Sequence, residues 1–200
     1  MKHDPHGLNI GSNEIVQVTL QTPEDSRKLL RDALGFDIIF AEEFKILRPY
    51  LGKMSREWAV QIRTKLIQDN TINPLFNKAD LFDLDGLLAA YFTEVRSSRF
   101  YEKFFVSVEA LAQFFIDKNV KSSWLVAAIM EVFHDAQLNL FFDKEARNGR
   151  VVVAALRCLM KIMTLTIQII NRVTFTQIAP SEEIVTIRNG QKTPKSPIAN

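Results

Sequence analysis

Apolar residues recur every three or four positions along most of this chain, which is the spacing of side chains on one face of an α-helix. One such stripe consists of Leu47, Leu51, Met54, Trp58, Ile62 and Leu66. Alternation of apolar and polar residues, the pattern of a strand, is limited to residues 183–188 and to a short stretch at 15–20. We therefore predict an all-α fold.

Capping residues and breaks divide this pattern into six helices. Thr22 suits an N-cap, Pro23 suits the first helical position, and Gly35 suits the end of the same helix. Pro49 is expected to kink the second helix or to begin a new one. The predicted helices cover residues 22–34, a long stretch that includes 47–66, then 87–95, 100–116, 124–142 and, longest of all, 146–177.

The composition is typical of one soluble globular domain, because 47% of the 200 residues are hydrophobic and 24% are charged. We expect a flexible N-terminal arm over residues 1–21, a folded domain over 22–178, and a flexible tail or linker over 179–200. A formal net charge of +2 is too small for the basic surface of a nucleic-acid-binding protein. Without an export signal or an uninterrupted apolar span, the sequence predicts a cytoplasmic protein with no membrane segment.

The segment 104–124 reads FFVSVEALAQFFIDKNVKSSW. It resembles the proximal helix of sensor globins and the turn that follows it. Leu111 and Ala112 match an Ile-Gly pair, and Trp124 matches the tryptophan that begins the next helix. Phe115 replaces the histidine that binds haem iron in those proteins. Because a phenyl ring has no lone pair to donate to iron, this substitution favours a haem-free protein.

Further segments extend the resemblance over residues 29–175. They are LRPYL at 47–51, IRTKL at 62–66, LLAAYFTEVRSSRF at 87–100 and WLVAA at 124–128. The chain is thus similar to the globin domain of globin-coupled sensors, and more closely to haem-free bacterial relatives. Those relatives are the sensor domains of stressosome scaffold proteins and stand-alone regulators of sporulation kinases. The resemblance implies a globin-like fold with an extra N-terminal helix and a long C-terminal helix.

The resemblance also implies a place for a ligand. In a globin arrangement the space that haem occupies would be lined by Ile62, Arg63, Phe92, Arg96, Leu111, Phe114 and Phe115. Haem-free relatives accept fatty acids, so one interpretation is an apolar channel in which Arg63 or Arg96 holds a carboxylate. The other interpretation is ordinary core packing with arginines that face solvent, because aromatic residues at helical spacing usually belong to a core.

Other chemistry has little support in the residues. His134 is the only histidine on a predicted core helix, and we interpret it as a satisfied or interface residue; a pH-sensitive contact or a haem ligand are the alternatives. The acids Asp80, Asp83 and Asp85 lack the later glutamate of a calcium loop and are interpreted as starters of the helix 87–95. The sequence contains no catalytic triad, zinc-binding pair or phosphate loop motif. We therefore expect no enzymatic activity, no cofactor and no metal.

The last predicted helix is apolar around most of its circumference, which indicates one face against the core and another against a second chain. The resemblance implies the same, because globin-coupled sensors dimerise through their last two helices. The predicted homodimer interface consists of Val152, Leu159, Ile162, Met163 and Ile169.

Together these features predict a non-catalytic signalling domain that works as a homodimer. Its input would be a small apolar ligand such as a fatty acid, or a partner protein such as a kinase or another stress-signalling protein. Two alternatives remain open from the sequence. One is a haem-binding gas or redox sensor with an unusual axial ligand, and the other is a structural dimerisation or scaffold module with a filled core.

Overall fold

The computed structural model describes residues 23–97, 99–142 and 149–178, and these residues form helices and no strand. The predicted all-α fold is therefore confirmed. The predicted flexible arm at 1–21, the predicted tail at 179–200 and both strand-like patterns lie outside the described residues. The globin-like arrangement itself stays a prediction.

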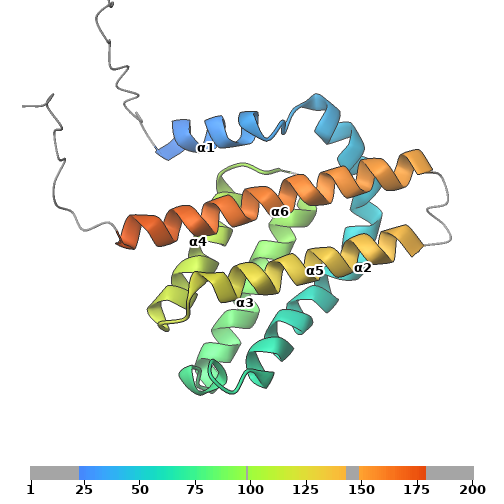
Figure 1. Cartoon of the computed structure of the whole chain (residues 1–200). Helices are drawn as coiled ribbons and strands as arrows, with labels where there is room; N and C mark the ends of the chain where they lie inside the picture. The colour runs from blue at the N-terminus through green and yellow to red at the C-terminus, as the bar shows by residue number, and fades with distance from the viewer. Residues whose placement is uncertain (1–22, 98, 143–148, 179–200) are drawn as a thin grey trace, which may run out of the picture.

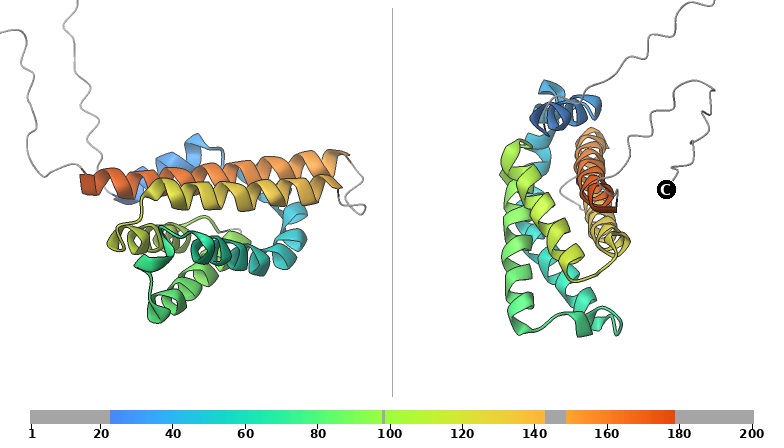
Figure 2. Two further views of the ribbon diagram at one scale, coloured as in Figure 1. Left: turned by 60° about the horizontal axis from the view of Figure 1, so that its bottom comes forward. Right: turned by 90° about the vertical axis from the view of Figure 1, so that its left-hand side faces the viewer.

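Two layers of helices and a covering helix make up the fold (Figure 1). In chain order the elements are α1 (Pro23–Ala33), α2 (Ile38–Gln68), the short 3-10 helix η1 (Asn73–Leu75), α3 (Lys78–Ser97), α4 (Glu102–Asp117), α5 (Ser122–Phe142) and α6 (Gly149–Ile178). Helices α5 and α6 lie side by side with opposite chain directions and pack on α2 and α4, as Figure 2 shows. Helix α1 lies across the end of the bundle.

The first two helices begin and end where their residues satisfy the backbone. Gly35 has a φ of +67° and closes α1, with Phe36 N–H donating to Arg31 O at 3.1 Å. The Asp37 carboxylate then accepts a hydrogen bond from Phe40 N–H at 2.9 Å and caps α2. The predicted end of the first helix at Gly35 is confirmed. Glycine suits this position because it has no Cβ and adopts a positive φ at little cost.

Two sequence predictions about the helices are wrong, and one of the two alternatives at Pro49 is excluded. Helix α2 continues through Pro49, so no new helix begins there, although its ribbon changes direction along its length (Figure 1). Helix α3 begins at Lys78, so the three acids lie inside it rather than before it. The longest helix is α2, with 31 residues, rather than α6, with 30.

Asp80 nevertheless helps to start α3. It lies three residues after Asn77, and each of the two side chains accepts a hydrogen bond from the backbone N–H of the other, at 2.9 and 3.0 Å. Its second carboxylate oxygen accepts a hydrogen bond from Lys118 Nζ at 2.6 Å, which ties the start of α3 to the end of α4. These contacts, with Lys118 first, lower the pKa of Asp80.

Acid is expected to remove the contribution that Asp80 makes to stability. The pKa of Asp80 is lower in the folded state than in the unfolded chain, where it is about 3.9. The charged carboxylate therefore stabilises the fold at pH values above about 3.9, and this stabilisation is lost as the pH falls through the folded-state pKa. The wild type should therefore be more stable than Asp80→Asn at neutral pH, and the two should converge as the pH falls through the folded-state pKa of Asp80. Urea unfolding followed by circular dichroism at several pH values measures this, and parallel curves would contradict it.

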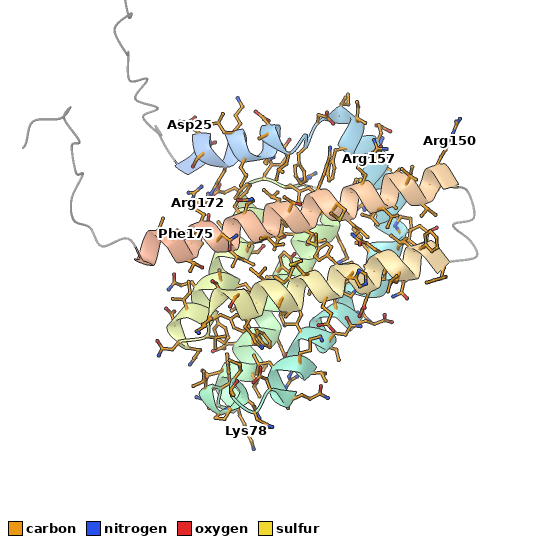
Figure 3. All side chains as sticks on the ribbon, viewed as in Figure 1. Asp25, Lys78, Arg150, Arg157, Arg172 and Phe175 are labelled. Atoms are coloured by element: carbon orange, nitrogen blue, oxygen red, sulfur yellow. The ribbon has the colours of Figure 1, made fainter. Side chains whose placement is uncertain are left out.

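Helix α1 is attached to the body by charged and polar contacts. Arg27 forms ion pairs with Glu102 and Glu109 of α4, the second at 2.7 Å, and its guanidinium lies over the Phe105 ring. From α6, Arg172 donates a hydrogen bond to Ser26 at 3.0 Å, and its position beneath α1 is visible in Figure 3. These contacts attach α1 to α4 and to the C-terminal half of α6.

The interior is filled by aromatic and branched side chains from the helices α2 to α6. Its largest fully buried members include Trp58, Tyr91, Phe104, Phe115 and Phe133. Tyr91 Oη and Thr166 Oγ1 form a hydrogen bond of 3.0 Å inside the core. It is the one fully buried hydrogen bond between two side chains among the described residues. Burial raises the pKa of Tyr91, so its hydroxyl stays neutral and serves the core as a hydrogen-bonding group.

Candidate functional site

The predicted ligand-lining residues separate into two groups in the structure. Ile62, Leu111 and Phe115 are fully buried in the core. The Phe115 ring stacks on Trp124, with centroids 5.5 Å apart, and also contacts the rings of Phe76 and Phe114. This group is a packed aromatic cluster rather than the lining of an open channel.

Trp124 is held in this cluster by the end of α2. Its indole Nε1–H donates a hydrogen bond to Asp69 Oδ2 at 3.1 Å. The other carboxylate oxygen of Asp69 accepts hydrogen bonds from Thr71 and Ile72, and the Thr71 contacts come first among those that lower the pKa of Asp69. The charged carboxylate therefore positions the ring that covers Phe115.

The second group lies at a groove between α2 and α3, which run in opposite directions. Arg63, Phe92 and Arg96 all line it, so the structure brings three of the predicted ligand-lining residues together. Its volume is about 420 Å³, within the range of ~300–1,000 Å³ that is common for small-molecule sites. Its full lining consists of Ser55, Arg56, Ala59, Val60, Arg63, Asp85, Ala89, Phe92, Thr93 and Arg96.

The groove is apolar along its middle and charged at its ends. Ala59, Val60 and Ala89 supply most of the apolar part, and Phe92, a core residue that is 2% exposed, adds only a small area. Three guanidinium groups and one carboxylate supply the charge, so the lining carries a surplus of positive charge (3 − 1 = +2). An anion with a hydrocarbon chain matches this distribution, because guanidinium binds carboxylates and phosphates through paired hydrogen bonds.

Two charged lining residues, Arg56 and Asp85, were missed by the sequence analysis. Arg56 lies one helical turn before Val60 and two turns before Arg63, on the same face of α2. Asp85 pairs with Arg63 at 2.8 Å, and both side chains are 41% exposed. The spacing of residues on α2 could have predicted that Arg56 shares a face with Arg63. The pairing of Arg63 with Asp85 could not be predicted in this way, because it depends on how α2 and α3 align.

A larger hollow of about 640 Å³ lies between α1 and α4. It is lined mostly by charged side chains of both signs. Arg27 pairs across it with Glu102 and also with Glu109, and the Arg31 guanidinium lies over the Tyr101 ring. These two arginines attach α1 to the body. The groove between α2 and α3 is the better candidate for a ligand because its apolar part and its positive charge remain available.

Residues that could support other chemistry lie apart from the groove. His134 is exposed on α5 and does not face the core. Burial, followed by the nearby Glu43, raises the pKa of the Cys158 thiol to about 12, so this thiol is not a ready nucleophile. Among the described residues no three His, Cys, Asp or Glu side chains gather in a way that could hold a metal ion.

Most of the predicted dimer interface is wrong. Leu159 and Ile162 are 0% exposed and Ile169 is 2% exposed, because α2, α4 and α5 all pack against α6 and enclose these side chains. Val152 and Met163 are half-buried. Leu159, Ile162 and Ile169 are therefore not available to a second chain.

The outer surface of α5 and α6 does expose large apolar side chains. They are Met130, Leu138, Phe141 and Phe142 on α5, and Val153, Met160 and Phe175 on α6. Met160 lies beside α5, because Gln137 Nε2 contacts its sulfur at 2.9 Å. Phe175 projects near the C-terminal end of α6 in Figure 3. Exposed apolar side chains along two neighbouring helices are typical of an interaction surface.

By length and composition alone, α5 and residues Gly149–Thr176 of α6 could each cross a membrane. This is weak evidence, because core helices of soluble proteins meet the same criterion. The inner faces of both helices are part of the core described above. The expectation that no segment crosses a membrane stays a prediction.

Comparison with known proteins gives no family for this chain. No family model matches it, and neither a curated protein nor a solved structure does. The functional argument therefore depends on the chain's own residues.

Proposed function

We propose that this protein is a non-catalytic cytoplasmic signalling domain that works without haem, binds an anionic amphiphile such as a long-chain fatty acid, and acts as a homodimer. The observation that carries the proposal is the groove between α2 and α3. It combines an apolar middle with three arginines in about 420 Å³. A hydrocarbon chain would cover Phe92 and Val60, and its carboxylate would meet guanidinium.

The aromatic cluster around Phe115 supports a haem-free protein. A globin binds iron through a side chain that donates a lone pair, and Phe115 offers none. Its ring is fully buried and stacked on Trp124, so the surrounding space is already used by side chains. The exposed position of His134 argues against it as a substitute ligand in the core.

The exposed apolar side chains of α5 and α6 support the homodimer. A specific interface of ordinary size buries about 800 Å² per partner and has an apolar centre with a polar rim. Met160, Leu138 and Phe141 supply apolar area, and Gln137 and His134 lie nearby on α5. A ligand in the groove would change signalling only if it binds one packing of the dimer better than the other.

Binding of palmitate to the protein after delipidation tests the ligand proposal. Trp58 contacts Phe92 with ring centroids 5.5 Å apart, so occupation of the groove should change tryptophan fluorescence. A saturating palmitate concentration should also raise the unfolding temperature, because a ligand of the folded state stabilises it. Neither change is expected with hexadecane sulfonamide, a neutral chain of similar length.

Other outcomes favour the alternative functions. A purified protein that absorbs in the Soret region would favour the haem sensor. A protein that forms a dimer but responds to no amphiphile would favour the structural module, which the filled aromatic cluster also fits. Retention of a specific kinase without any small molecule would favour a protein signal.

A further inference from the structure

The two ends of the groove differ in their charge. Arg63 of α2 pairs with Asp85 of α3 at 2.8 Å, and the rings of Trp58 and Phe92 are in contact at 5.5 Å. These two contacts fix the alignment of the antiparallel helices. They place Asp85 beside Arg63 at one end, and they place Arg56 toward Thr93 and Arg96 at the other.

At the Asp85 end the positive charge is already neutralised. Arg63 has its carboxylate partner, so an incoming anion would have to displace Asp85 and would be repelled by it. The Nε of Arg63 is buried and has no hydrogen-bond partner among the described residues, so it is not presented to the groove surface.

At the other end the positive charge is not neutralised. Arg56 is exposed and forms no ion pair with any described residue. Arg96 donates a weak hydrogen bond to Thr93 of its own helix at 3.3 Å and likewise has no carboxylate partner among the described residues. Arg56 and Arg96 come from facing helices and line the same groove, so their two guanidinium groups can bind one carboxylate from both sides.

We infer that Arg56 and Arg96 form the head-group site of the groove, and that Asp85 occupies Arg63 and so fixes the direction in which an amphiphile lies. The inference rests on the proposed function and specifies its ligand. The carboxylate is held between Arg56 and Arg96, and the hydrocarbon chain runs over Ala59, Val60 and Phe92 toward Asp85. A chain with a carboxylate at both ends is disfavoured, because its second charge would approach Asp85.

Titration of the full chain with palmitate, measured by isothermal calorimetry, tests this arrangement. Arg56→Gln and Arg96→Gln should each raise the dissociation constant by ~10-fold or more, which is the usual effect of losing one charged hydrogen bond. Arg63→Gln is the matched control on the same face of α2 and should change it by less than ~3-fold. Circular dichroism of each variant confirms that the fold is intact.

Arg56 and Arg63 are seven residues apart on α2, roughly 10 Å along the helix, and Asp85 pairs with Arg63. Decanedioate, whose two carboxylates are separated by about that length, tests the role of Asp85. The wild type should bind it at least ~5-fold more weakly than decanoate, and Asp85→Asn should remove most of that difference while leaving decanoate binding within ~3-fold. If Arg63→Gln weakens palmitate binding as much as Arg56→Gln and Arg96→Gln do, the inferred head-group site is wrong while the proposed function stands. If the wild type binds no palmitate, the proposed function is wrong and this inference with it.

Discussion

Replacing Ile162 by glutamate is expected to unfold the protein rather than to separate a dimer. Ile162 is 0% exposed and lies in the core where α6 meets the other helices. A carboxylate there would lose its hydration without gaining a partner, and it would also disrupt close packing. The expected cost is at least about 4 kcal/mol, a large share of the about 5–15 kcal/mol that stabilises a typical domain. Thermal unfolding followed by circular dichroism tests this, and the variant is expected to show no cooperative transition.

Met160→Glu is the matched control, two positions earlier on the same helix. Met160 is 47% exposed on the outer surface of α5 and α6, so its replacement should change the free energy of unfolding by less than about 1 kcal/mol. If the proposed dimer uses this surface, the variant should be monomeric in sedimentation analysis while the wild type is dimeric. A dimeric Met160→Glu would place the interface elsewhere, and a folded, stable Ile162→Glu would contradict the burial of α6 described here.

Replacing Phe115 by alanine is expected to destabilise the fold by about 3–5 kcal/mol, because it removes a fully buried ring and leaves a cavity. The loss also removes the stacking on Trp124 and the contact with Phe76. Guanidinium unfolding followed by far-ultraviolet circular dichroism measures the change in the free energy of unfolding.

Phe114→Ala provides the comparison, because Phe114 is the neighbouring ring and is only partly buried. Its replacement should cost clearly less than that of Phe115, on the order of 1–2 kcal/mol. Equal losses at the two positions would mean that Phe115 is not at the centre of a packed cluster. A small loss at Phe115 would indicate that its surroundings collapse easily or already contain free space.

The helices could largely be predicted from the sequence because their limits depend on local chemistry. Gly35 ends α1 and Asp37 begins α2 through hydrogen bonds within a few residues. The start of α3 was missed because Asp80, Asp83 and Asp85 were interpreted together as starter residues. Only Asp80 acts in that way, while Leu84 and Leu88 already continue the buried stripe of α3. Acids on the outer face of a helix do not interrupt its apolar pattern.

The interface was mispredicted for a different reason. The sequence indicates that α6 is apolar on most sides, but it does not say how many helices of the same chain surround it. Helices α2, α4 and α5 all pack against α6. The face of α6 that was assigned to a second chain is therefore largely buried within the same chain. The outward residues Val153, Met160 and Phe175 could be identified only once that packing was known.

Some of the residues at the candidate site could be predicted from the sequence. Arg63, Phe92 and Arg96 were expected near one ligand and do line one groove, although Ile62, Leu111 and Phe115 belong to the core instead. The roles of Arg56 and Asp85 depend on the alignment of α2 with α3, which long-range packing decides. Helical spacing places residues on one face, but it does not pair that face with the facing helix.

The central claim is that the arginine-lined groove binds an anionic amphiphile. Native mass spectrometry of delipidated protein incubated with palmitate tests this claim most directly. The account predicts one bound palmitate per chain in the wild type. It predicts that the double variant Arg56→Gln/Arg96→Gln, which remains folded, loses that adduct. Absence of any adduct in the wild type, or an adduct of equal abundance in the double variant, would contradict it.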